Sequence, residues 1–187
     1  MSPFLVLGLP RCRTAWLARF LSVPGRACVH EPSRFWASLV DLQAALARDD
    51  FAASDSCLTL RWREIIAARP DARLVVVRRS VDAVLASADR LGLVGPSTES
   101  GLRALDAACD EMLEIPQASH VLADALGDMR LAAAVFEKCH GYRMPREQWL
   151  AWGGKVVVAD TDQHLADAAA NAAGFRALFP ELSREAA

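Results

Sequence analysis

Residues 4–21 read FLVLGLPRCRTAWLARFL, and this stretch decides the fold that we expect. The apolar run Phe4–Leu7 stops at Gly8 and is typical of a buried strand. A turn with a proline and two arginines follows, and the apolar residues at 16, 17, 20 and 21 then have helical spacing. Helix N-terminal N–H groups and arginine guanidinium groups both bind phosphate oxygens. The order strand, basic turn, helix therefore predicts a phosphate cradle.

Length and composition predict one globular domain that spans residues 1–187. The chain has 187 residues, of which 53% are hydrophobic and 24% charged. This is enough apolar material for a sizeable core, and it excludes a disordered chain. The formal net charge of −2 gives no support for nucleic-acid binding, which favours strongly basic surfaces.

Cysteine usage and hydropathy predict a reduced, cytoplasmic protein. The five cysteines are odd in number and widely scattered, with no C-x-x-C pair. No signal peptide is recognisable, and no apolar run reaches the roughly 20 residues that span a bilayer, so we expect no membrane partner. The four histidines do not fall at metal-ligand spacing with the cysteines, so we also expect no metal site.

The basic turn is not a Walker A loop, which requires G-x-x-x-x-G-K-[ST]. The chain has only two lysines, Lys138 and Lys155, and both are far from the turn in sequence. Residues 8–17, GLPRCRTAWL, instead resemble the 5′-phosphosulfate loop of sulfotransferases, whose usual form is G-x-P-R-S-G-T-T-x-L. The matching residues are Gly8, Pro10, Arg11, Thr14 and Leu17.

Three residues of the turn depart from this pattern, namely Cys12, Arg13 and Ala15. Ala15 stands where the pattern has a second threonine, so a hydroxyl that could bind the phosphate is missing. Arg13 stands where the pattern has glycine, and a side chain is strained there if the loop needs a positive φ. From this loop alone, an ordinary strand-turn-helix with surface arginines is as good an interpretation as a phosphate loop.

A titratable pair follows the second strand that we expect, Arg26–Val29. Open α/β sheets place their chemistry at the carboxyl ends of strands, where His30 and Glu31 would lie. The resemblance to sulfotransferases implies that one of the two accepts the proton of the acceptor. The alternative is a charge–dipole contact for Glu31 and a packing role for His30. A helix is expected to begin at Pro32 and Ser33 and to bury one stripe of residues: Phe35, Leu39, Leu42 and Leu46.

A second motif occupies residues 75–87, VVVRRSVDAVLAS. The continuous apolar run Leu74–Val77 predicts a strand covered on both faces, and Ser80 is a good helix N-cap. The segment resembles the signature that binds the 3′-phosphate in sulfotransferases, R-x-x-x-x-x-x-x-S, which Arg79 and Ser87 meet. Arg78 fits instead if Asp82 takes the place of the Asp in R-x-P-x-D, so both arginines are candidates. The alternative is a pair of solvated arginines at a strand end.

Alternating strands and helices predict an α/β fold with a mostly parallel sheet between helices. The resemblance covers the chain to about residue 152 and implies a P-loop-type three-layer sandwich. An alanine-rich stretch beyond it predicts a C-terminal helical extension over residues 160–187.

The resemblance also implies a reaction. The donor would be 3′-phosphoadenosine 5′-phosphosulfate, and its sulfuryl group would pass to a hydroxyl or amine acceptor that the sequence does not identify. Arg11, with Glu31 or His30, would be catalytic. The residues implied around the donor are Gly8, Pro10, Arg11, Cys12, Arg13, Thr14 and Ala15 for the 5′-phosphate and Arg78, Arg79 and Ser87 for the 3′-phosphate.

Other function classes stay open. A P-loop kinase or nucleotide hydrolase would turn over ATP with magnesium, and the missing Walker lysine counts against it. Asp55 could act as a Walker B carboxylate, but without that lysine a capping role within the turn Ser54–Ser56 is favoured. A non-catalytic nucleotide-binding or interaction module would fit the substitutions at positions 12, 13 and 15. The last interpretation is an α/β domain with no small-molecule site.

Overall fold

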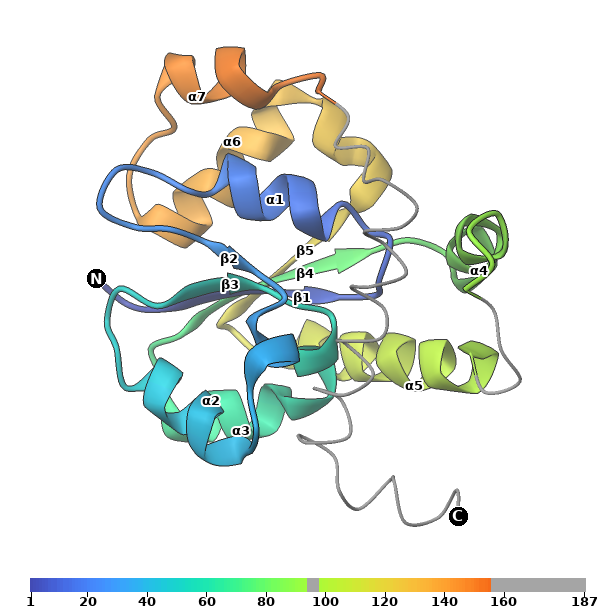
Figure 1. Cartoon of the computed structure of the whole chain (residues 1–187). Coiled ribbons are helices and arrows are strands. Elements are labelled where there is room, and N and C mark those ends of the chain that lie inside the picture. The colour runs from blue at the N-terminus through green and yellow to red at the C-terminus, as the bar shows by residue number, and fades with distance from the viewer. Residues whose placement is uncertain (94–97, 156–187) are drawn as a thin grey trace.

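The computed structural model describes residues 1–93 and 98–155 and builds them around one sheet (Figure 1). The strands lie in the order β2-β3-β1-β4-β5, and every neighbouring pair is parallel. The α/β fold with a mostly parallel sheet is therefore confirmed. The strands are β1 (Phe4–Gly8), β2 (Val29–His30), β3 (Ala52–Ser54), β4 (Arg73–Arg78) and β5 (Ala118–Leu122).

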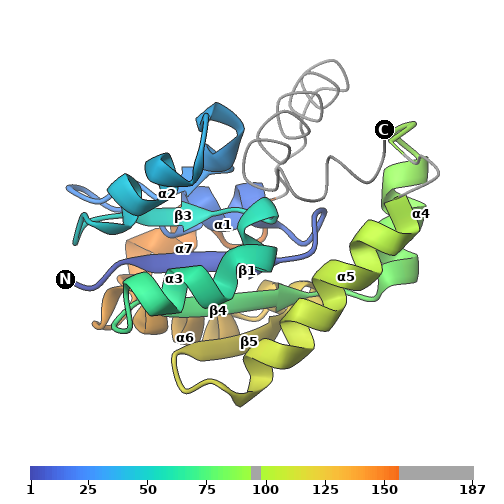
Figure 2. The ribbon, with the colours of Figure 1, turned by 90° about the horizontal axis from the view of Figure 1, so that it is seen from below.

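Helices cover both faces of this sheet, as the two ribbon views show (Figures 1 and 2). Helices α1 and α6 lie on one face with α7 outside them, while α2, α3 and α5 lie on the other face. Helix α4 lies beyond the carboxyl ends of the strands. The helices are α1 (Thr14–Phe20), α2 (Leu39–Leu46), α3 (Trp62–Ala68), α4 (Val81–Asp89), α5 (Thr98–Glu111), α6 (Met129–His140) and α7 (Arg146–Trp152). The predicted three layers are present.

Strands β1 and β4 form the centre of the core. No side chain of Phe4–Leu7 or of Leu74–Val77 is exposed, and the two strands pair from Phe4 opposite Arg73 to Gly8 opposite Val77. Continuous apolar strands are required here because helices cover both faces of the sheet. The basic turn thus leaves the carboxyl end of the central strand, where the order of strands along the chain reverses and parallel sheets bind their ligands.

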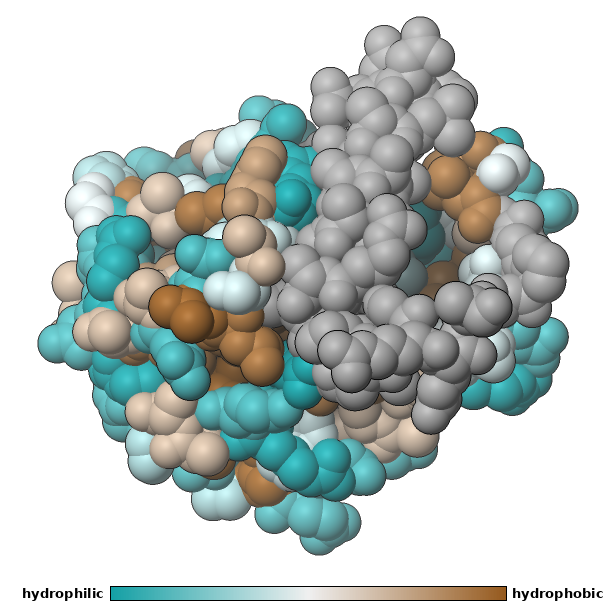
Figure 3. Space-filling view, turned by 60° about the horizontal axis from the view of Figure 1, so that its bottom comes forward, coloured by the Kyte–Doolittle hydropathy of each residue, from teal (hydrophilic) through white to brown (hydrophobic). Residues whose placement is uncertain are grey.

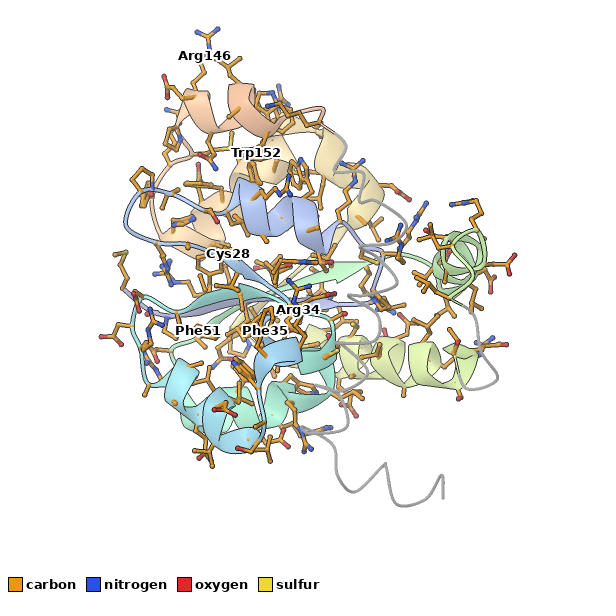
Figure 4. All side chains as sticks on the ribbon, in the orientation of Figure 1. Cys28, Arg34, Phe35, Phe51, Arg146 and Trp152 are labelled. Atoms are coloured by element: carbon orange, nitrogen blue, oxygen red, sulfur yellow. The ribbon has the colours of Figure 1, made fainter. Side chains whose placement is uncertain are left out.

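Helix α7 fixes the helix that follows the basic turn. The indole Nε1 of Trp16 donates at 3.0 Å to the carbonyl of Trp152, which is labelled in Figure 4. The Trp16 ring stacks on Phe20 with centroids 4.6 Å apart. At the other end of α1, the amide of Gln148 donates to the carbonyls of Phe20 and Ser22. Tertiary contacts therefore hold α1 near both of its ends.

The single helix expected from residue 32 to residue 46 is wrong. The chain instead forms a 3₁₀ turn over Pro32–Phe35 and starts α2 after Ser38. Ser38 and Asp41 form a capping box, which satisfies backbone N–H groups at a new helix start. Phe35 was expected to be buried, but it is 73% exposed and carries the Arg34 guanidinium 4.8 Å from its ring centroid (Figure 4). The expected burial of Leu42 and Leu46 is confirmed.

Two short strands also differ from expectation. The second strand comprises Val29–His30 rather than Arg26–Val29, because reciprocal hydrogen bonds between Val23 and Arg26 close a tight turn there. Ser54, which we assigned to a turn, is the last residue of β3. Three residues are too few to show a strand period, so pairing with β1 and β2 defines β3.

In the face that Figure 3 turns forward, small hydrophobic areas lie among hydrophilic ones on the described residues. Residues 1–93 and 98–155 include no helix that is both long and apolar enough for a membrane span. The same ranges hold no group of three or more His, Cys, Asp or Glu side chains placed to bind a metal. The extension predicted over 160–187 lies outside the described residues.

Candidate phosphate site at the carboxyl ends of the strands

Gly8 begins the basic turn in a position that admits no other residue. Its φ is +140°, and a Cβ built on it would lie 2.0 Å from the carbonyl oxygen of Val77 in β4. The buried hydroxyl of Thr59 holds the same residue, because it accepts from the Gly8 N–H at 2.8 Å and donates to the Gly8 carbonyl at 2.9 Å. Sequence reasoning missed Thr59, which lies 51 residues away and belongs to no motif.

The turn then curls through two left-handed residues. Arg11 has φ +64° and Arg13 has φ +63°, whereas Cys12 between them does not have a positive φ. Such alternation points successive N–H groups toward one side and forms a concave anion site. The strain that we associated with a side chain at position 13 is therefore present. A left-handed conformation costs about 1–2 kcal/mol for a residue with a Cβ, and such strain clusters at functional sites.

Arg13→Gly is expected to raise the free energy of unfolding by about 1 kcal/mol, because glycine adopts this conformation without a Cβ clash. The Arg13 side chain is exposed, so its removal takes little packing away. Arg13→Ala is the matched control, since it removes the same charge and keeps the strain. Urea denaturation of both variants measures the difference, and equal stability of the two would contradict strain at this position.

Cys12 contributes its backbone rather than its thiol. The side chain is fully buried, and burial raises the pKa of the thiol to about 12. The thiol is therefore neutral and packed in the core at ordinary pH. The sulfotransferase pattern has a serine hydroxyl at this position, whereas Cys12 can offer a ligand only its main-chain groups.

The two predicted phosphate motifs meet at Arg11 and Ser87. The Arg11 Nε donates to the Ser87 Oγ at 3.3 Å, across 76 residues of sequence. Burial lowers the pKa of the Arg11 guanidinium; the charges of Arg90 and Arg79 act in the same direction, and Glu31 opposes them. The charged side chain shown to bind Ser87 thus lies within the field of three others, Arg79, Arg90 and Glu31.

The structure separates the two neighbouring arginines of the second motif. Arg78 donates to Asp106 and Asp110 of α5, at 2.5 Å each, and so ties β4 to that helix. Arg79 instead lies near Arg11, 3.7 Å from a carboxylate oxygen of Asp124. Its Nε is buried and has no hydrogen-bond partner among the described residues. Of the two candidates, Arg79 is the one whose charge acts on Arg11, the residue that is hydrogen-bonded to Ser87.

His30 and Glu31 lie against the basic turn. The His30 Nε2 is 3.2 Å from the hydroxyl of Thr14, the first residue of α1, and 3.8 Å from a carboxylate oxygen of Glu31. Glu31 is buried with φ +46°, and its N–H donates to the carbonyl of Ser54 at 2.9 Å. The Ser54 hydroxyl donates to the Thr14 carbonyl at 2.9 Å, so β3 holds both segments together.

Asp55 fixes the turn that carries this pair. The side chain is fully buried, and its two oxygens accept from the N–H groups of Ser33 and Cys57 at 2.9 Å each. Burial raises the pKa of this carboxyl. The contacts confirm the turn-capping role favoured from the sequence over a Walker B role.

Comparison with known proteins gives a likeness among solved structures. No family model matches the chain, and no curated protein matches it. Among solved structures, a sulfotransferase from Alicyclobacillus acidocaldarius is similar over 95% of this chain and 95% of its own, with a TM-score of 0.49 and 16% identity. A likeness at this level assigns no activity, so the function has to be argued from the residues of the site.

Proposed function

We propose that the protein is a sulfotransferase that moves the sulfuryl group of 3′-phosphoadenosine 5′-phosphosulfate to a hydroxyl or amine. The hydrogen bond between Arg11 and Ser87 carries this proposal, because it joins two segments that separately resemble the 5′- and 3′-phosphate motifs. A donor with a phosphate at each of these positions needs both segments in one place. The left-handed curl of the turn supports the same ligand, since it builds an anion site beside them.

The proposed reaction breaks one bond and forms one. The acceptor oxygen or nitrogen bonds to sulfur, the bond between sulfur and the 5′-phosphate oxygen breaks, and adenosine 3′,5′-bisphosphate leaves. Negative charge then grows on the phosphate oxygen, where Arg11 neutralises it and the turn with Thr14 holds it. The acceptor proton passes to His30 or Glu31, since the His30 Nε2 lies 3.2 Å from the Thr14 hydroxyl and 3.8 Å from a Glu31 carboxylate oxygen.

The positions of the lysines favour this chemistry over a P-loop kinase. Lys138 lies in the last turn of α6, and its carbonyl accepts from Arg73 at the amino end of β4. The Lys155 ammonium lies 5.2 Å from the Trp152 ring centroid, at the end of α7. Within the part of the chain that the structure describes, neither lysine is paired with a residue of the basic turn, whereas the turn itself contains Arg11 and Arg13, so we assign its positive charge to arginines.

Calorimetric titration tests the donor site. We expect the wild type to bind adenosine 3′,5′-bisphosphate with micromolar affinity and ATP more weakly. Arg79→Ala should lower the affinity for the bisphosphate at least about tenfold, since a charged hydrogen bond is removed. Arg63→Ala is the control, because this exposed arginine pairs with Glu111 away from the site. Failure of the wild type to bind the bisphosphate would refute the proposal. Binding without transfer of labelled sulfuryl to any of a panel of alcohols and amines would instead support a non-catalytic nucleotide-binding module.

A further inference from the structure

The charges of three arginines act together at the hydrogen bond between Arg11 and Ser87, although like charges repel. Arg11 is hydrogen-bonded to this serine, and the charges of Arg90 and Arg79 both act on the Arg11 guanidinium, with Arg90 the stronger of the two. Two of the three, Arg11 and Arg79, were already candidates from sequence motifs, whereas Arg90 belongs to none. The arrangement is therefore more basic than either motif alone implied.

Arg90 reaches this cluster through the geometry of α4. It is the C-cap residue of the helix and lies three positions after Ser87, so both side chains leave the same helical face. Arg90 is exposed, and among residues 1–93 and 98–155 it forms no ion pair with a carboxylate. Arg78, by contrast, binds two aspartates, and Arg103 binds Glu99.

Two carboxylates lie near these arginines among the residues that the structure describes. Glu31 acts on Arg11, and an oxygen of Asp124 lies 3.7 Å from Arg79. No carboxylate is paired with Arg90 in the same part of the chain. Forked guanidinium donors beside a hydroxyl suit the oxygens of a phosphate monoester, which carries more charge than a carboxylate.

We propose that Arg90 is a further donor-binding residue, which contacts the ribose 3′-phosphate together with Ser87 and Arg79 and makes the site prefer a nucleotide with that phosphate. This inference rests on the proposed function and adds a determinant of its specificity. The alternative role for Arg90 is purely structural, namely a favourable contact of its positive charge with the carboxyl end of α4. That role would change the stability of α4 but would not distinguish one nucleotide from another.

The test compares two ligands that differ only in the 3′-phosphate, adenosine 3′,5′-bisphosphate and adenosine 5′-monophosphate. Calorimetry gives the Kd of each for the wild type, Arg90→Ala, Arg90→Lys and Arg130→Ala. Arg130 is the control because it is an exposed arginine near the start of α6, outside the cluster. We expect Arg90→Ala to raise the Kd of the bisphosphate about tenfold and to change the Kd of the monophosphate by less than about twofold. Arg90→Lys should recover part of the loss, because it restores the charge without the forked donors.

Each other outcome overturns a distinct claim. The wild type could prefer the bisphosphate while Arg90→Ala raises the Kd of both ligands equally, or changes the Kd of neither. In that case the role of Arg90 is refuted and the proposed function stands. If the wild type binds the bisphosphate no better than the monophosphate, the donor assignment itself fails, and this inference fails with it. Thermal unfolding of Arg90→Ala shows whether α4 is intact, so a folding defect is not mistaken for lost selectivity.

Discussion

Arg11→Ala is expected to lower kcat for sulfuryl transfer by at least about 10³-fold, the range seen when a transition-state cation is removed. The reason is the place of Arg11 in the left-handed turn, from which its side chain reaches Ser87 of the second motif. No other cation of the turn can replace it, since Arg13 is exposed at the N-cap of α1. Transfer of labelled sulfuryl to an acceptor found by the screen measures the effect.

The control for this variant is Arg19→Ala, which removes an exposed arginine from the last turn of α1 and should keep wild-type turnover. Arg11→Ala should also unfold at nearly the same denaturant concentration as the wild type, because its side chain is only partly buried. Wild-type kcat in a folded Arg11→Ala protein would remove Arg11 from the mechanism. An equal loss in Arg19→Ala would point to disruption of α1 instead.

Gly8→Ala is expected to lower the free energy of unfolding by about 3 kcal/mol or more, because overpacking and a disallowed φ act together. The added Cβ would lie 2.0 Å from the carbonyl oxygen of Val77, and backbone atoms of the central strand pair cannot move aside cheaply. Separation of β1 from β4 would also break the two hydrogen bonds that Thr59 makes to Gly8. Urea denaturation measures this loss.

Gly101→Ala is the control, because it should change the free energy of unfolding in the opposite direction. Gly101 lies inside α5, and a Cβ there would meet nothing within 4 Å. Alanine should therefore raise the free energy of unfolding by about 0.5–1 kcal/mol through its higher helix propensity. A Gly8→Ala protein as stable as the wild type would show that β1 and β4 are farther apart at Gly8 than described here.

Much of the local structure could be predicted because local sequence encodes it. The continuous apolar runs of β1 and β4 indicated strands that are buried on both faces, and no side chain of either run is exposed. Ser80 caps α4 and Asp128 caps α6, as short polar residues before helices do. Gly141 ends α6 in a left-handed conformation, which glycine commonly adopts directly after a helix.

The misses share one physical reason, which is that the deciding partner is distant in sequence. β3 is a strand only because it pairs with β1 and β2. Thr59 carries no motif, yet it holds both polar backbone groups of Gly8. Phe35 fitted the apolar stripe of one long helix, but the capping box at Ser38 starts a separate helix and leaves Phe35 exposed.

The sequence by itself determined two basic turns, each at the carboxyl end of an apolar run and each followed by a helix. Only the tertiary structure decided that these turns meet through Arg11 and Ser87, and that Arg78 pairs with aspartates of α5. It also decided that the charges of Arg79 and Arg90 act on Arg11. The hydrophobic period specifies which face of an element is buried, and capping residues specify where a helix begins or ends. Neither signal specifies which other element covers the buried face. Because all strands of the sheet are parallel, their carboxyl ends meet at one edge, and that edge brings together residues 76 positions apart.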